Sequence, residues 1–182
     1  MVWDLPFFRE RKGLVGALLG GWGMRSIVIL QSGNPFTVGI QNNWSRNLNR
    51  RPGIDRPNLR PGFTAERIIL GRPERYFDPN GFELPEPGTY GNMGRNVLIG
   101  PGMATVDWSM VKCVPIPQLG ESGGLQLRFE FFNLLNRANF NLPQRIVFAG
   151  AEPREVPLGS AGVITSTTTP GRQIQFALRL SW

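Results

Sequence analysis

In the last eleven residues, 172–182 (RQIQFALRLSW), a large apolar side chain occupies every second position from Ile174 to Trp182. Ile174, Phe176, Leu178, Leu180 and Trp182 form the apolar set, and Arg179 belongs to the mostly polar set between them. This period of two predicts a β-strand with one wholly apolar face. Because an exposed apolar strand promotes aggregation, we expect this face to contact either a protein core or lipid. A strand that crosses a bilayer at a tilt needs about 9–11 residues, and this segment is long enough.

Four further segments show a related pattern and predict more strands: 1–7, 21–38, 104–114 and 125–135. If the apolar faces meet lipid, charges at the alternate positions would face a water-filled lumen. Aromatic side chains in an ordinary protein core are the alternative interpretation. The side chains expected to face lipid or to form an aromatic girdle at its boundary are Trp22, Trp108, Met110, Leu127, Phe129 and Phe131. The side chains expected to face the lumen are Arg25, Asp107, Arg128, Glu130 and Arg179.

The connections between the predicted strands alternate between short and long. Residues 8–20 and 116–124 form the shorter connections, whereas 39–103 and 136–171 form long loops. Loops of this length are uncommon in compact soluble domains. Membrane β-barrels, in contrast, combine tight periplasmic turns with long extracellular loops. If the strand at 172–182 descends to the periplasmic side, every short turn falls on that side and both long loops lie outside the cell.

Composition argues against several classes of protein. The chain has no His and a single Cys, which excludes His-based triads, His metal sites and an internal disulfide. Cys113 is interpreted as an ordinary strand residue. No run of about 18 apolar residues is present, so the sequence predicts no transmembrane helix. The carboxylates Glu83 and Glu86 lie in a Pro-rich loop that does not hold them at a catalytic distance. We therefore expect no enzyme activity, no metal and no cofactor.

The long loop 39–103 includes an Arg-rich stretch, and the chain as a whole carries 20 basic and 13 acidic residues, a net charge of +7. A solvated loop without a partner is one interpretation. Contact with anionic lipopolysaccharide or another anionic ligand is a second. Nucleic-acid binding is disfavoured, because acidic residues are interspersed and aromatic residues for base stacking are sparse. The arginines are Arg46, Arg50, Arg51, Arg56, Arg60, Arg67, Arg72 and Arg75.

Several strings resemble, in the same order, the barrel of TonB-dependent outer-membrane receptors of the Oar-like group. They are LLGGWGMRSIVILQSGNPFTV, FDPNGFELPEPGTYGNMGRNVLIGPGMATVDWSMVK, LQLRFEFFNLLNRANFNLP and GVITSTTTPGRQIQFALRLSW. The resemblance implies a longer receptor in the bacterial outer membrane, with a plug that engages the TonB system and a barrel of about twenty-two strands. It also implies that Ile174, Phe176, Leu178, Leu180 and Trp182 form an assembly signal for the barrel-assembly machinery, which would bind them by strand addition.

The sequence thus predicts an all-β fold, an antiparallel up-and-down transmembrane β-barrel segment with long extracellular loops. Residues 1–182 would supply about four or five strands of the C-terminal part of the receptor barrel, with 172–182 as the closing strand. Such a fragment cannot close a barrel, so we expect it not to transport a substrate alone. The alternative is a soluble exported antiparallel β domain that binds carbohydrate or protein, as an adhesion module would, through its long loops.

Overall fold

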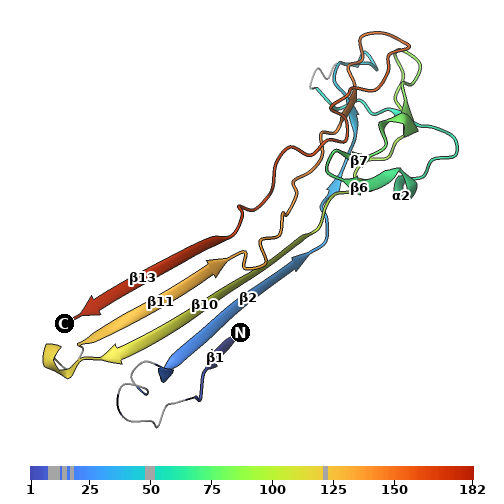
Figure 1. Ribbon diagram of the computed structural model, residues 1–182. Helices are drawn as coiled ribbons and strands as arrows, with labels where there is room; N and C mark the ends of the chain where they lie inside the picture. Colours follow the sequence, from blue (N-terminus) through green and yellow to red (C-terminus); the bar gives the residue numbers. More distant parts are fainter. Residues whose placement is uncertain (8–12, 14–15, 17–18, 48–51, 121–122) are drawn as a thin grey trace. The chain divides into compact units, whose positions relative to one another are not determined.

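The computed structural model describes residues 1–7, 13, 16, 19–47, 52–120 and 123–182 (Figure 1). The chain divides into two units, which are treated separately below. The first, called the sheet unit, comprises Met1–Leu30, Ala104–Ala138 and Thr169–Trp182. The second, called the packed unit, comprises Gln31–Met103 and Asn139–Thr168.

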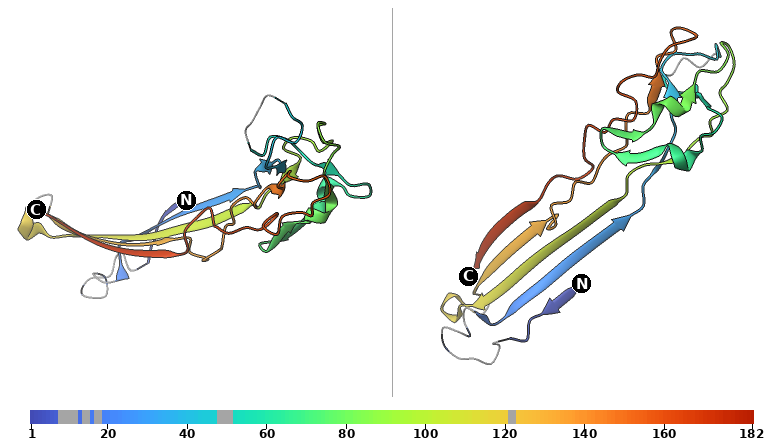
Figure 2. Two further views of the ribbon diagram at one scale, coloured as in Figure 1. Left: turned by 90° about the horizontal axis from the view of Figure 1, so that it is seen from above. Right: turned by 45° about the vertical axis from the view of Figure 1, so that its right-hand side comes forward.

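The sheet unit is built on one five-stranded sheet. Every pair of neighbouring strands whose register is known is antiparallel. In both views of Figure 2 the strands lie in a single layer. The predicted all-β, antiparallel fold with about five strands is therefore confirmed. In spatial order the strands are β1 (Val2–Asp4), β2 (Trp22–Gln31), β10 (Met103–Pro115), β11 (Gly124–Phe132) and β13 (Gln173–Ser181).

Strands β10 and β11 are joined by a tight connection. It begins with the 3-10 helix η2 (Pro117–Leu119), because proline at the first helical position needs no N–H donor there. Gly120 then adopts a positive φ of 100°, and the Ile116 N–H donates to the Gly123 carbonyl across the turn at 2.9 Å. Residues 121–122, and most of the predicted connection 8–20, lie outside the described residues.

The packed unit contains short strands joined in pairs. Three pairs are antiparallel, β3–β9, β5–β8 and β6–β7, whereas β12 pairs with β4 in parallel. Residues 39–103 and 136–171 were expected to form long irregular loops, and these ranges carry most of these strands. The elements are β3 (Pro35–Phe36), β4 (Gly39–Ile40), β5 (Asn58–Leu59), α2 (Ala65–Ile68), β6 (Ile69–Arg72), β7 (Arg75–Phe77), η1 (Pro79–Gly81), β8 (Phe82–Glu83), β9 (Leu98–Ile99) and β12 (Ile146–Phe148).

The hydrophobic core of the described residues lies in the packed unit. Phe77 and Phe82 are fully buried at its centre, with their rings edge to face at a centroid distance of 5.8 Å. Segments far apart in the sequence contribute, since Val38 and Ile40 share this core with Val147 and Phe148. The buried apolar residues are Phe36, Val38, Ile40, Trp44, Ile68, Tyr76, Phe77, Phe82, Met93, Leu98, Val147, Phe148, Ala161 and Ile164.

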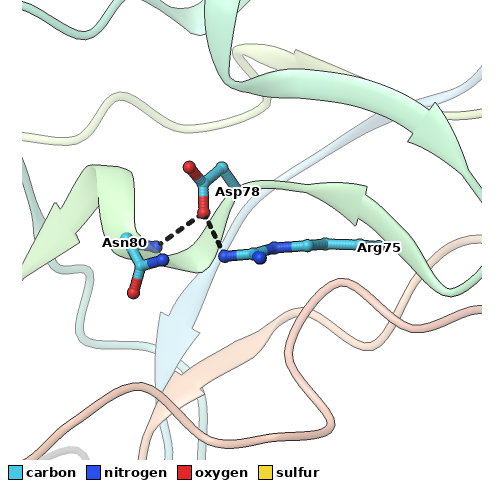
Figure 3. Close-up of polar contacts among 3 residues, drawn as sticks. All are labelled: Arg75, Asp78 and Asn80. Atoms are coloured by element: carbon cyan, nitrogen blue, oxygen red, sulfur yellow. Dashed lines mark hydrogen bonds and ion pairs between the residues drawn. The ribbon is translucent and has the colours of Figure 1, made fainter.

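Local hydrogen bonds fix the surface of the packed unit. Thr64 caps α2, because its hydroxyl accepts a hydrogen bond from the Arg67 N–H at 3.3 Å. Asp78 plays the corresponding part for η1: its carboxylate accepts from the Asn80 N–H at 3.2 Å and pairs with the Arg75 guanidinium at 2.5 Å (Figure 3). One basic and one acidic side chain, those of Arg75 and Asp78, thus stabilise a turn.

Candidate membrane interface

The register of the sheet places the predicted lipid-facing residues on one face. Residues directly opposite each other in neighbouring antiparallel strands project to the same side of the sheet. Phe129 aligns with Met110 on β10 and with Phe176 on β13, and the two phenyl rings meet edge to face at 5.3 Å. The other rows across β10, β11 and β13 are Trp108–Phe131–Ile174, Lys112–Leu127–Leu178 and Val114–Leu125–Leu180.

Trp22 extends this apolar face to β2, since its ring lies 5.7 Å from the ring of Phe129. At β13, no second layer of described residues covers the face (Figure 2). As a result Phe176 and Leu178 each remain 68% exposed, and Trp182, just beyond β13, is 84% exposed. A contiguous apolar surface of this kind marks a site that contacts another protein or a membrane.

The predicted lumen-facing residues lie on the opposite face. Cross-strand alignment puts Glu130 beside Ser109 and Gln175, Arg128 beside Val111 and Ala177, and Gln126 beside Cys113 and Arg179. Arg128 and Glu130 form a loose ion pair at 3.8 Å. Both of these residues, with Arg25 and Asp107, line one hollow of about 190 Å³. Arg179 instead lines a hollow of about 330 Å³ near the β10–β11 turn, together with the exposed Cys113.

Comparison with known proteins agrees with this two-faced sheet. The family model described as "Outer membrane beta barrel domain" matches residues 1–175. The chain belongs to the outer membrane beta barrel domain family. The membership indicates a location in the bacterial outer membrane, and the strands supply an antiparallel segment of such a barrel. No curated protein and no solved structure matches the chain significantly.

Sequence reasoning missed one residue of the barrel's apolar face. Lys112 occupies the row of Leu127 and Leu178 and is only 4% exposed. Its ammonium group donates to the Gly20 carbonyl at 2.5 Å and lies 5.4 Å from the centre of the Trp22 ring. A carbonyl acceptor and an aromatic face together replace part of the water that a buried ammonium loses. Continuing the alternation two residues past Met110 would have placed Lys112 on this face.

A second group that sequence reasoning missed is centred on Asn133, where β11 ends. Its backbone N–H donates to the Asp107 carboxylate at 2.9 Å, and its side-chain amide donates to the carbonyls of Arg137 at 2.9 Å and Pro170 at 3.2 Å. Asn133 itself has a positive φ of 49°, a conformation that Asn tolerates better than most residues. These bonds join the end of β11 to the segment that leads into β13. Asp107, predicted to face the lumen, thus also anchors this junction.

Among the described residues, two arginines of the Arg-rich stretch lie close to carboxylates. Arg60 lies 3.7 Å from Glu83, and Arg75 pairs with Asp78. Arg50 and Arg51 lie outside the described residues. Among the residues that the structure describes, no helix is long and apolar enough to span a bilayer. Nor does the described part of the chain hold a group of three His, Cys, Asp or Glu residues placed to bind a metal ion.

Proposed function

We propose that the chain is a segment of the barrel of a TonB-dependent outer-membrane transporter. The observation that carries this proposal is the uncovered sheet with one apolar and one charged face. In hydrocarbon an apolar strand face is stable, whereas the charged face needs the water of a lumen. In this arrangement Phe129 and Phe176 contact lipid and Arg128 and Glu130 contact water.

The strand count supports a larger barrel. Single-chain outer-membrane barrels have about eight strands or more, and the sheet here has five, with β1 and β13 at its edges. A sheet edge in hydrocarbon would leave backbone N–H and C=O groups without hydrogen-bond partners. We therefore propose that further strands complete the barrel, and that the chain does not transport a substrate without them.

The proposed orientation follows from the connections. The η2 turn between β10 and β11 would face the periplasm, and the packed unit would lie outside the cell, next to lipopolysaccharide. Long extracellular segments of barrel proteins are where ligands are recognised. Coupling to the TonB system, which the sequence resemblance implies, would act through a plug domain. We assign the chain no catalytic role.

Cell fractionation tests the membrane assignment against the alternative of a soluble exported β domain. The complete receptor that contains the chain, produced with a signal peptide, should be recovered from outer membranes only with detergent. Its barrel should migrate faster on a gel before heating than after. Recovery as a monodisperse protein in the soluble periplasmic fraction would contradict the membrane proposal and support the alternative, which the separate core of the packed unit favours.

The proposed assembly signal has its own test. In the complete receptor, deletion of Trp182 or the double change Phe176→Asp and Leu178→Asp should reduce membrane insertion by the barrel-assembly machinery. The opposite-face change Ala177→Ser is the matched control, because it leaves the apolar face intact. Normal heat-modifiable barrel in the two altered proteins would refute the signal role.

The receptor assignment is tested by the genome sequence immediately upstream of the Met1 codon. We expect in-frame codons for a plug and for additional barrel strands. A separate promoter and start site at that position, with no such codons, would contradict the assignment to a TonB-dependent receptor.

A further inference from the structure

A polar hollow in the packed unit has the properties of a ligand site. Its volume is about 580 Å³, within the range of about 300–1,000 Å³ usual for small-molecule sites. All the residues that line it belong to the packed unit. Among the residues that line it are Thr37, Arg56, Tyr90, Arg95, Asn96 and Arg145.

Close backbone packing positions one side of the hollow. A Cβ on Gly39 would lie 2.6 Å from the Gly53 carbonyl oxygen, so only glycine lets β4 approach residues 53–56 this closely. The Gly53 N–H donates to the Ile40 carbonyl at 3.0 Å. On the other edge of β4, the Gly39 N–H donates to the Arg145 carbonyl, also at 3.0 Å. The backbone at Arg145 and the segment that carries Arg56 are therefore both attached to β4.

The other side is fixed in the same way. A Cβ on Gly91 would lie 2.1 Å from the Arg56 carbonyl oxygen, so the backbone next to Tyr90 rests directly on that of Arg56. Thr37 holds the neighbouring turn, since its hydroxyl contacts the Asn96 side-chain oxygen at 2.9 Å and accepts from the Asn96 N–H at 2.8 Å. Asn96 has a positive φ of 56° there. The hollow is thus built from several segments with defined hydrogen bonds.

Charge distinguishes this hollow from the rest of the Arg-rich region. Arg56, Arg95 and Arg145 line it, and among the residues that the structure describes no acidic residue does. Within the described part of the chain these three arginines form no ion pair, in contrast to Arg60 and Arg75. The carboxylate of Asp55, beside Arg56 in sequence, is buried and accepts hydrogen bonds from the Ser45 N–H and hydroxyl at 2.7 and 2.8 Å. Three arginines of the hollow are therefore available to attract an anion.

We propose that this hollow binds a small acidic saccharide. A guanidinium binds a carboxylate with two parallel hydrogen bonds. Tyr90 is 66% exposed, so its ring is free to pack against the apolar face of a sugar ring. The volume exceeds what a simple inorganic anion fills, and the amide of Asn96 suits sugar hydroxyls. This inference rests on the proposed receptor function and names the class of ligand.

Binding of labelled digalacturonate to outer-membrane vesicles that contain the receptor tests the inference. Arg95→Gln should weaken binding at least about tenfold, because a hydrogen bond to a charged group is lost. Arg154→Gln removes the same charge from an exposed position of the packed unit outside the hollow and should leave the affinity unchanged. Tyr90→Ala should weaken binding, whereas Tyr90→Phe should not.

Two ligand controls separate the possible outcomes. The dimethyl ester of digalacturonate, which lacks the charges, should bind at least about tenfold more weakly. Inorganic phosphate should compete poorly. Equal binding of the ester, or of Arg95→Gln and wild type, overturns the proposal, and so does a site that takes phosphate but not the saccharide.

The state of the protein is measured in the same vesicles. Heat-modifiable barrel without saccharide binding overturns the ligand proposal and leaves the receptor function standing. If the protein is instead recovered in soluble form, the receptor proposal fails, and the same titrations on the soluble protein decide the ligand proposal.

Discussion

The two units of this chain bury their apolar side chains in different ways. The packed unit carries its own core, in which Phe77 and Phe82 are fully buried. The sheet unit has apolar side chains of the same size, such as Phe176 and Leu178, that remain 68% exposed. The first arrangement is stable in water, whereas the second needs a nonpolar surrounding. One chain of an outer-membrane family thus contains a part suited to lipid and a part suited to water.

The largest effect should come from the core of the packed unit. Phe77→Ala removes a fully buried ring, which costs about 3–5 kcal/mol. Proteases added to outer-membrane vesicles should then cleave residues 31–103 or 139–168 more rapidly, while the barrel stays heat-modifiable. Leu135→Ala, at a 69% exposed position of the sheet unit, is the control. If Phe77→Ala also abolished membrane insertion, the two units would not be independent.

The next effect tests the apolar face of the sheet. Leu178→Arg puts a charge on the proposed lipid-facing side of β13, at a cost of about 2–4 kcal/mol near the bilayer centre. We expect less inserted barrel in outer-membrane fractions. Gln175→Arg adds the same charge to the opposite face of the same strand, beside Glu130, and should insert normally. Equal insertion of the two variants would show that the apolar face does not contact lipid.

A moderate effect is expected where the sheet unit depends on protein contacts instead of lipid. Asn133→Gly keeps the positive φ accessible but removes the side-chain hydrogen bonds to Arg137 and Pro170. Leaving these groups unpaired should cost about 1–3 kcal/mol. The measurement is the temperature at which the folded form disappears in a heat-modifiability series. Asn141→Gly, an exposed position of the packed unit, should leave this temperature unchanged.

The smallest effect concerns pH and the packed unit. Burial raises the pKa of Tyr76 above its ordinary value of 10.0, and its hydroxyl donates to the Ile99 carbonyl at 3.0 Å. Folding disfavours the ionised form of Tyr76, so the neutral side chain contributes fully to the free energy of unfolding at a pH below its unfolded pKa. This contribution to stability is lost as the pH rises through the raised pKa of the folded state. Protease resistance of the packed unit should therefore fall above about pH 10. Tyr76→Phe should lack this component and lose about 0.5–1.5 kcal/mol at neutral pH; an unchanged pH profile would contradict the assignment.

Sequence alone predicts the sheet unit well, because alternation is a local signal. The strand expected at 172–182 is β13, Gln173–Ser181, and the strand expected at 104–114 is β10, Met103–Pro115. The alignment of Met110 with Phe129 then follows from the short turn between β10 and β11 and from matching apolar faces. Lys112 shows what alternation cannot predict. The period of two places its side chain on the apolar face, but its contacts are with Gly20, in the connection before β2, and with Trp22 in β2.

The packed unit could not be predicted in the same way. Most of its strands have two to four residues, too few for a period to be recognised. Its core joins Val38 and Ile40 to Val147 and Phe148, more than a hundred residues later. The hollow depends on the backbone contact between Gly91 and Arg56, which no local pattern indicates. In the sequence, Arg56 groups with seven other arginines of the long loop, and no local pattern combines it with Arg95 and Arg145.

The parallel pairing of β4 with β12 has a consequence for the timing of biogenesis. The register aligns Gly39 with Ile146, and β10 and β11 lie between these residues in the sequence. The first segment of the packed unit therefore cannot complete its core until the second has joined it, which in the proposed barrel means delivery to the same side of the membrane. Contacts this distant in sequence form late. An assembly intermediate in which residues 139–168 have not yet been delivered would leave Val38 and Ile40 exposed to water and to proteases.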